Sequence, residues 1–225
     1  MFTGPNIVTE GLVLALDAGN KKSYPGSGTT WTDLSGQGNN GTLQNGPTFD
    51  SGNNGSIVFD GVNDYISIES ISLNSANITA ISWVYLNSFY ESQNSTIGIH
   101  IDGGTNGGFR VYAKSSLTGV WMRYSNGNAT SISSNNTLPL NKWFQITFIS
   151  DGQTGKIYLN ENVFLSGTFS NTPVNVNGSA WISRFSGGGY YLVGNTSTSL
   201  LYNRALTPQE VQQNYNATKS RFGLT

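Results

Sequence analysis

The stretch Trp143-Phe144-Gln145-Ile146-Thr147-Phe148-Ile149-Ser150 decides the fold class of this chain. Phe144, Ile146 and Phe148 stand two residues apart, and the polar residues Gln and Thr stand between them. Because side chains alternate between the two faces of a strand, this spacing places the large apolar groups on one face. The pattern predicts a β-strand with one buried face and one polar face.

A second stretch, Ile78-Thr79-Ala80-Ile81-Ser82-Trp83-Val84-Tyr85-Leu86, is apolar on both of its faces. Val84 and Leu86 share one side, and Ile81 and Trp83 share the other. A strand that has no polar face needs cover on both sides. We therefore expect this segment to lie at the centre of a sheet, between two covering layers.

Further apolar segments of strand length follow the same composition, rich in Ile, Val, Tyr, Phe, Trp and Thr. Turn-forming clusters such as Asn53-Asn54-Gly55 and Asp151-Gly152 separate them. No alternation with helical patterns of 10–15 residues occurs, so a parallel α/β sheet is not expected. The sequence predicts an all-β fold, with strands at Gly11–Ala18, Ser56–Asp60, Tyr65–Ile68, Thr96–Ile101, Phe109–Ala113, Val120–Tyr124, Lys156–Asn160, Val163–Leu165, Ala180–Phe185 and Tyr190–Tyr202.

One short helix is predicted near the end of the chain. Thr207-Pro208-Gln209-Glu210 has Thr at the N-cap, Pro at the first helical position and Glu at the third, which is a capping box. Val211, Tyr215 and Thr218 then recur at helical spacing. We expect this helix to pack on the edge of the sandwich. The chain shows no linker or repeat, so residues 11–225 are predicted to form one domain, with residues 1–10 as an N-terminal arm that docks on a partner.

The composition excludes several classes of protein. The chain has 225 residues, of which 10% are charged, and a formal net charge of -1; soluble domains average about 25% charged residues. It has no Cys and one His, which excludes disulfides, thiol chemistry and zinc sites with several histidines. Without a basic excess, binding to nucleic acid is not expected. No apolar run is long enough to insert into a membrane.

Aromatic residues in the middle of the chain are the candidates for a sugar-binding surface, because the faces of sugar rings stack on aromatic rings. The candidates are Tyr90, His100, Trp121 and Tyr124. His100 lies between Ile99 and Ile101, so it faces away from the core that these two residues enter. The alternative for each aromatic candidate is packing in the core, where most aromatic residues of a sandwich lie.

Acidic residues are the candidates for calcium or for glycoside hydrolysis. Asp60 and Asp64 form the densest acidic pair, and Asp33 lies in another loop. These three residues, together with backbone carbonyls, are the candidate calcium ligands. The alternative is that each Asp only shapes its turn. Hydrolysis usually needs two carboxylates about 5–9.5 Å apart, and the glutamates are isolated in the sequence.

Segments near both ends of the chain form a recognisable set. They are Gly11–Asn20, Ser23–Gly36, Asn39–Leu43 and Phe59–Tyr65 at the start, and Tyr202–Glu210 and Ala217–Gly223 at the end. The set resembles laminin-G-like domains of the concanavalin A-like lectin/glucanase superfamily, of the type common in bacteriophage structural proteins. The resemblance implies an antiparallel two-sheet jelly-roll sandwich that binds glycans in many members and calcium in some, with no cofactor required. Related hydrolases carry a Glu-x-Asp-x-x-Glu strand, and no stretch here matches it.

Three functional hypotheses follow. The first is a non-enzymatic virion surface protein of a bacteriophage, a capsid decoration or fibre-associated protein that also binds host glycans. Its expected partners are other virion proteins and copies of itself, and its expected location is the virion surface, since no signal-peptide pattern is present. The second is a lectin-like carbohydrate-binding module of a cell-surface protein. The third, disfavoured by the missing carboxylate motif, is a glycoside hydrolase.

Overall fold

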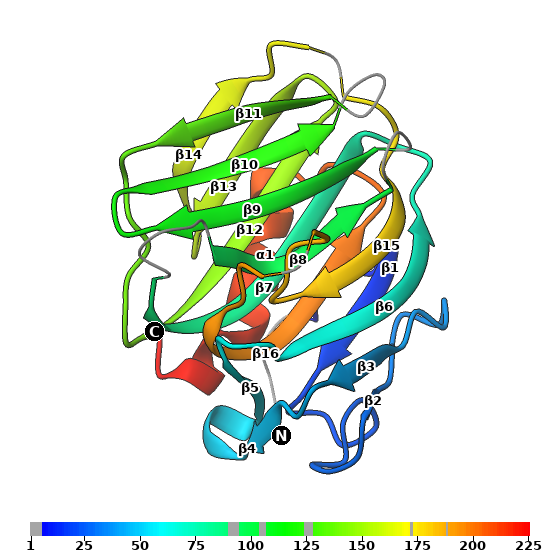
Figure 1. The fold of residues 1–225 in the computed structure, drawn as a ribbon, viewed down its shortest axis with the longest axis vertical. Coiled ribbons are helices and arrows are strands. Elements are labelled where there is room, and N and C mark those ends of the chain that lie inside the picture. Colours follow the sequence, from blue (N-terminus) through cyan, green and yellow to red (C-terminus); the bar gives the residue numbers. More distant parts are fainter. Residues whose placement is uncertain (1–5, 90–94, 104–106, 124–127, 172, 188) are drawn as a thin grey trace.

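Two antiparallel sheets pack face to face in the computed structural model of the chain (Figure 1). The structure describes residues 6–89, 95–103, 107–123, 128–171, 173–187 and 189–225, with Trp121 and Arg123 described by their backbone alone. Large apolar side chains such as Trp31, Phe59, Phe109 and Phe148 fill the space between the sheets and are fully buried. The predicted two-sheet jelly-roll sandwich with one short C-terminal helix is confirmed.

The first sheet, called sheet A, contains the two stretches that decided the fold. Its strands in spatial order are β14 (Asn162–Thr168), β13 (Thr154–Leu159), β12 (Trp143–Asp151), β7 (Asn77–Ser88), β16 (Val193–Tyr202), β5 (Ser56–Asp60) and β4 (Thr48–Asp50). A further strand, β1 (Leu12–Asp17), pairs with the second half of β16.

The second sheet, called sheet B, lies in front in Figure 1. Its strands in spatial order are β11 (Ala129–Ser134), β10 (Leu117–Arg123), β9 (Gly108–Lys114), β8 (Ser95–Asp102), β15 (Asn177–Ile182), β6 (Tyr65–Ser72), β3 (Gly41–Gln44) and β2 (Thr30–Trp31). The helix α1 (Pro208–Thr218) and the 3₁₀ turn Lys219–Phe222 follow β16 on the opposite side of sheet A.

The prediction for β7 is confirmed, since the strand lies between β12 and β16 and is covered on both sides. Its inner residues Val84 and Leu86 enter the core between the sheets. On its outer side, the Trp83 ring stacks on Phe222 at 4.1 Å and on Tyr215 at 5.8 Å between ring centroids. The helix therefore covers the face of sheet A, and the prediction that it packs on the sandwich edge is wrong.

The layer outside sheet A also buries the face of β12 that was predicted to be exposed. Phe144, Ile146 and Phe148 enter the core as predicted. The polar face is not exposed, however: Gln145 is 1% exposed and Thr147 is fully buried. The prediction of a strand with only one buried face is wrong, because a layer outside sheet A covers the second face.

The predicted capping box is present at the start of α1. The Thr207 side chain accepts a hydrogen bond from the Glu210 amide, and the Glu210 carboxylate accepts one from the Thr207 amide at 2.8 Å. The same carboxylate forms a bidentate ion pair with Arg204, with N–O distances of 2.6 and 2.9 Å. This pairing lowers the pKa of Glu210 to about 2. The cap thus joins the helix to the end of β16.

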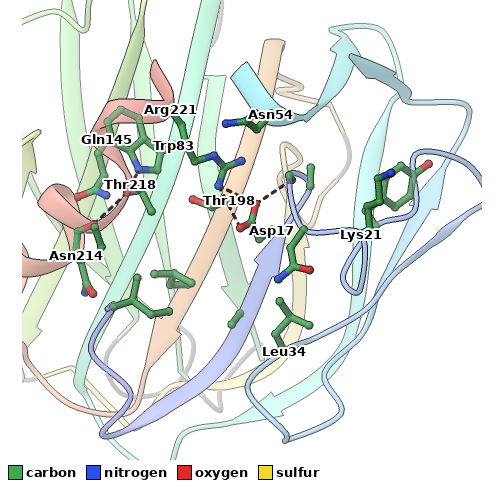
Figure 2. Close-up of a pocket in the computed structure, with 18 of the residues that line it drawn as sticks. Asp17, Lys21, Leu34, Asn54, Trp83, Gln145, Thr198, Asn214, Thr218 and Arg221 are labelled. Atoms are coloured by element: carbon green, nitrogen blue, oxygen red, sulfur yellow. Dashed lines mark hydrogen bonds and ion pairs between the residues drawn. The ribbon is translucent and has the colours of Figure 1, made fainter. Parts of the chain in front are cut away.

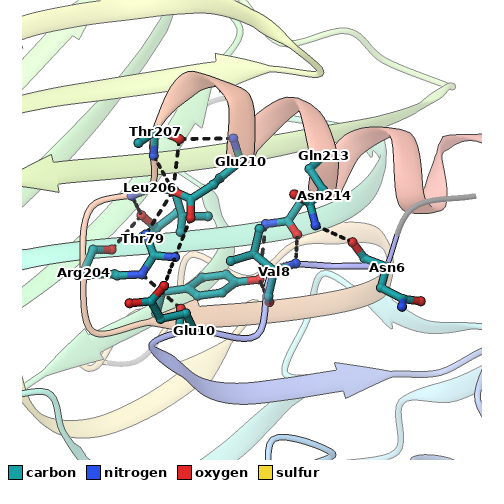
Figure 3. Close-up of polar contacts among 11 residues, drawn as sticks. Asn6, Val8, Glu10, Thr79, Arg204, Leu206, Thr207, Glu210, Gln213 and Asn214 are labelled. Atoms are coloured by element: carbon teal, nitrogen blue, oxygen red, sulfur yellow. Dashed lines mark hydrogen bonds and ion pairs between the residues drawn. The ribbon is translucent and has the colours of Figure 1, made fainter.

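Residues 6–10 lie against the helix and β16 of the same chain (Figure 3). The Val8 amide donates to Asn214 Oδ1 at 2.8 Å, and the Tyr202 hydroxyl donates to the Val8 carbonyl at 2.9 Å. Arg204 Nε also donates to the Glu10 carbonyl at 3.0 Å. These bonds fasten the described part of the N-terminal segment to its own domain. The predicted boundary between an arm (1–10) and a domain (11–225) stays a prediction.

Candidate binding surfaces

A row of paired positions crosses the outer face of sheet B. Trp181 on β15 pairs with His100 on β8, which pairs with Arg110 on β9. On both sides of this row, neighbours such as Ile99 and Ile101 enter the core. The row therefore lies on the outer face, and adjacent members are about 4.8 Å apart, the spacing of neighbouring strands.

Aromatic rings and guanidinium groups gather over this row, from strands β6, β8, β9 and β15 and from the loop between β15 and β16. We call the set the sheet-B platform; its described members are Tyr65, His100, Arg110, Tyr112, Trp181, Arg184, Phe185 and Tyr190. The Tyr65, Trp181, Phe185 and Tyr190 rings are half-buried, so each keeps an exposed part. A surface of half-exposed rings with fixed N–H donors is the usual composition of a ligand site.

Arg110 lies beneath three of the platform's rings. Its guanidinium carbon is 4.7 Å from the Phe185 centroid, 4.9 Å from that of Tyr190 and 5.8 Å from that of Tyr112. Its Nε donates to Thr96 Oγ1 at 2.9 Å. Burial lowers the pKa of Arg110 to about 10, so the side chain is still charged at neutral pH. The cation holds the rings in place through cation–π contacts.

Arg184 adds a second guanidinium at the edge of the platform. Its guanidinium carbon lies 4.4 Å from the Tyr65 centroid. Its Nε is buried and has no acceptor within the described part of the chain. A buried donor without an acceptor costs free energy, and a ligand oxygen would remove that cost.

His100 faces outward, as its alternation with Ile99 and Ile101 predicted, but it has no exposed surface. Its ring stacks on Phe185 with centroids 5.4 Å apart and lies 5.6 Å from Trp181. Its Nδ1 is 3.2 Å from the Arg184 carbonyl oxygen. His100 thus supports the platform from below, and direct contact of His100 with a glycan stays a prediction.

The other predicted sugar-binding residues are only partly described. Trp121 pairs with Arg110 in the register of β10 and β9, which continues the row, but its side chain lies outside the described part of the structure. Tyr90 and Tyr124 lie outside the described residues altogether. The platform residues Trp181, Phe185 and Tyr190 were missed, because strand pairing places Trp181 beside His100 and the path of the loop after β15 places the other two rings against Arg110.

The three predicted calcium ligands lie in two separate turns, Asp33 in one and Asp60 with Asp64 in the other. The Asp33 carboxylate accepts hydrogen bonds from the amides of Ala15, Ser35 and Asn39 and from the Ser35 hydroxyl, at 2.7–3.0 Å. Among the described residues, no group of three or more His, Asp or Glu side chains is placed to hold a metal ion. Asp33 therefore does not join the acidic pair in one carboxylate site.

Asp60 and Asp64 are adjacent in one tight turn. Asp60 Oδ1 accepts a hydrogen bond from the Val62 amide at 2.8 Å, which lowers the pKa of Asp60. Asp64 Oδ2 accepts one from the Asp60 amide at 3.2 Å, while burial raises the pKa of Asp64. Both carboxylates shape the turn, and calcium binding by either one with backbone carbonyls stays a prediction.

A pocket of about 1000 Å³ opens on the outer face of sheet A (Figure 2). Strands β1 and β16 form its floor through Ala15, Asp17 and Leu200. The helix and the 3₁₀ turn form one wall, and the loop after β1 forms the other. No pattern in the sequence indicates this pocket, because its walls come from segments near the two ends of the chain.

The two antiparallel sheets, the covered outer face of sheet A and the aromatic outer face of sheet B define a lectin-type β-sandwich. The chain belongs to the Concanavalin A-like lectin/glucanases superfamily, whose model matches residues 60–212. This match confirms the family to which the terminal motifs pointed. The matched segment begins at Asp60, so the opening motifs from Gly11 to Leu43 lie outside it.

Solved structures share the fold at low sequence identity. The binding domain of Paraclostridial Mosquitocidal Protein 1 matches with a TM-score of 0.69 and 19% identity, over 93% of this chain and 52% of that chain. The botulinum neurotoxin serotype G binding domain matches with 0.69 and 18%, over 91% and 50%. The chain thus spans about half the length of these toxin domains.

A third structure matches over nearly its whole length. Domain 4 of AbnA, an extracellular arabinanase from Geobacillus stearothermophilus, was solved with arabinotriose and matches with a TM-score of 0.65 and 17% identity. The match covers 91% of this chain and 98% of that domain. No curated protein matches the sequence significantly. Among the described residues, no helix is both long and apolar enough to cross a membrane.

Proposed function

We propose that the chain is a non-enzymatic, lectin-like module that binds glycans on the sheet-B platform. The observation that carries the proposal is the set of half-exposed rings held by Arg110 and His100 on one face of the sheet. Trp181 and Tyr65 offer ring faces to a sugar, and Arg184 offers an N–H donor to a sugar oxygen. The solved arabinanase domain that holds arabinotriose shares this fold, which supports the sugar class.

A glycan array with and without a platform ring tests this proposal. The wild-type chain should bind at least one glycan of a broad array that includes arabinotriose. Trp181→Ala should weaken that binding about tenfold or more, which corresponds to about 1.4 kcal/mol. Trp181→Tyr keeps an aromatic face and should restore most of the affinity.

Two controls separate binding from folding. Ser67→Ala changes the position that pairs with Trp181 on β6 and should leave glycan binding unchanged. Circular dichroism and thermal melts should show that each variant is folded at the assay temperature. A well-folded wild-type chain that binds nothing on the array would overturn the proposal.

We further propose that this module acts on the surface of a bacteriophage virion, as a capsid decoration or fibre-associated protein. The terminal motifs resemble those of bacteriophage structural proteins, and the low charge of a chain with 10% charged residues suits close packing beside neighbouring subunits. Its partners would then be other virion proteins and further copies of the chain. Mass spectrometry of purified particles should find it in stoichiometric amounts; its absence from particles would contradict the proposal.

The alternative is that the same glycan-binding module belongs to a cell-surface protein. Export of the chain in its native cell, detected by surface labelling, would favour this setting over the virion. A calcium requirement is tested in the same assays, because chelation with EDTA should abolish glycan binding if Asp60 or Asp64 holds the ion. Glycan release by the wild-type chain would instead favour the hydrolase hypothesis.

A further inference from the structure

The pocket on sheet A lies on the face opposite the sheet-B platform and takes no part in the function proposed above. Its walls come from segments far apart in the sequence: residues 6–9, the loop after β1, and the helix with the 3₁₀ turn (Figure 2). A volume of about 1000 Å³ is at the upper end of the range for small-molecule sites.

One part of the pocket is aliphatic. Leu12 and Ala15 of β1 and Leu200 of β16 lie on its floor, and Leu34 lies on the loop side. Leu34 is 40% exposed, one of the most exposed large apolar side chains among the described residues. An apolar ligand group that covers Leu34 and its neighbours would remove apolar surface from water, which favours binding.

The charges that line the pocket are largely balanced. Asp17 accepts two hydrogen bonds from Arg221 Nη1, at 2.9 and 3.1 Å, and Arg221 Nη2 donates to Ser197. Lys21 lies exposed on the loop. Because the Arg221 cation and the Asp17 anion pair with each other, the interior of the pocket favours a neutral ligand over an ionic one.

The other polar groups at the helix side already have partners. Thr218 Oγ1 accepts from Trp83 Nε1 at 2.8 Å and donates to the Asn214 carbonyl at 3.1 Å. The Asn214 side chain bonds to the Val8 amide and to the Tyr202 hydroxyl. All of these groups already have hydrogen-bond partners, so they line the pocket but do not need a ligand to satisfy them.

Gln145 differs from these neighbours. Its side chain lines the pocket beside Trp83, with which it pairs in the register of β12 and β7 (Figure 2). It is 1% exposed, and its Oε1 is buried with no donor among the described residues. A buried acceptor without a donor is unfavourable, and an O–H or N–H group of a ligand in the pocket would satisfy it.

We propose that this pocket is a second binding site, which takes a small neutral molecule with an aliphatic part and a hydroxyl-bearing part. The aliphatic part packs on Leu12, Leu34 and Leu200, and a ligand hydroxyl donates to Gln145 Oε1. This site is independent of the glycan-binding platform, because no platform residue lines it.

The test uses n-octyl β-D-glucoside, kept as a monomer below its micelle concentration, and the full chain labelled with ¹⁵N. Titration followed by NMR should shift the Gln145 side-chain amide signals and give a saturable affinity. Gln145→Leu removes the acceptor and should weaken binding about tenfold. Leu34→Asn should weaken it by a smaller factor, and glucose, which has no aliphatic part, should bind more weakly than the glucoside.

Thr147→Val is the matched control. Thr147 is the next outward residue of β12, is fully buried, and also has an Oγ1 without a partner among the described residues, but it does not line the pocket. This variant and Trp181→Ala should bind the glucoside like the wild type. No saturable binding by the wild type, or equal affinity in Gln145→Leu, would overturn the proposal. The thermal midpoint of Gln145→Leu should not fall, which separates lost binding from lost folding.

Discussion

The outer faces of the two sheets carry different kinds of cover. Sheet A is covered by the helix and by residues 6–10, and hydrogen bonds from Trp83 to Thr218 and from Tyr202 to Val8 fasten both to the sheet. Sheet B carries two rings from the loop after β15: Phe185 stacks on His100 and meets Tyr190 edge to face, and Arg110 lies against both. A fastened cover stabilises the fold, whereas a cover of half-exposed rings remains available to a ligand. Stability therefore depends mainly on the first face, whereas the proposed glycan binding depends on the second.

The largest loss of stability is expected from Trp83→Ala, on the outer face of sheet A. The Trp83 ring is fully buried beneath Phe222 and Tyr215, so its removal should cost about 3–5 kcal/mol of unfolding free energy. Trp181→Ala on the platform should cost less than half as much, because that ring is half-exposed. Urea denaturation measures both values, and equal losses would break the distinction between the two faces.

A conservative variant sharpens that result. Trp83→Phe keeps a ring between Phe222 and Tyr215 but loses the hydrogen bond from Nε1 to Thr218. Its cost should fall well below that of Trp83→Ala, since most of the stacking area remains. A cost as large as that of the alanine variant would show that the hydrogen bond, and not the ring, fastens the helix.

The ion pair at the start of α1 predicts a pH dependence. Arg204 lowers the pKa of Glu210 from 4.5 to about 2, so folding gains stability from this carboxylate at every pH above about 4.5. That gain should disappear as the pH falls from about 4.5 to 2. Glu210→Gln should cost about 1 kcal/mol at pH 7 through the lost ion pair with Arg204, since Gln can still accept the hydrogen bond from the Thr207 amide. The difference from the wild type should shrink at low pH in denaturation experiments; a constant difference would contradict this assignment.

A loss of similar size is expected from Arg110→Lys on the platform. Lysine keeps the charge but cannot present a planar group to Phe185 and Tyr190, so unfolding should become easier by about 1 kcal/mol. Glycan affinity should fall further than stability does, because the rings lose their support. A variant with normal glycan affinity would indicate that Arg110 serves stability alone.

The smallest effect belongs to Leu34→Asn in the pocket on sheet A. Leu34 is exposed on a loop, and such a change should alter the unfolding free energy by no more than about 0.5 kcal/mol. The same variant should still weaken binding of the glucoside. A large loss of stability would mean that Leu34 belongs to the fastened cover and not to a binding pocket.

The fold was predictable where the sequence has a clear period. Alternation in Trp143–Ser150 and the two apolar faces of Ile78–Leu86 placed β12 and β7 correctly, and the capping box placed the helix start. Strand β11 was missed, because Ala129-Thr130-Ser131-Ile132-Ser133-Ser134 offers a single large apolar residue. Such a strand forms because its neighbour β10 provides the pairing, and not because of its own pattern.

The candidate sites were harder to predict, because they depend on contacts between distant segments. Gln145 looked like a solvent-facing residue, but it is 1% exposed and lines one pocket with Asn214 and Thr218 of the helix, about 70 residues later in the chain. His100 was predicted on the correct face of its strand. The residues next to it in the sequence do not predict that the Phe185 ring covers it. The pairing of Trp181 with His100 follows from strand register, which residue periodicity does not specify.

The pairing of β1 with β16 determines how the molecule responds to a mechanical pull on its two ends. Leu12 pairs with Tyr202, so both chain ends leave this strand pair on the same side. Tension would therefore part the two strands one hydrogen bond at a time, instead of shearing all of them together. The hydrogen bonds from Val8 to Asn214 and from Arg204 to Glu10 lie between the chain ends and the Leu12–Tyr202 pair, so tension reaches them first. These contacts, together with the stack of Phe222 on Trp83, come before the strand pair on the path from the chain ends, so they would set the force at which the domain begins to open.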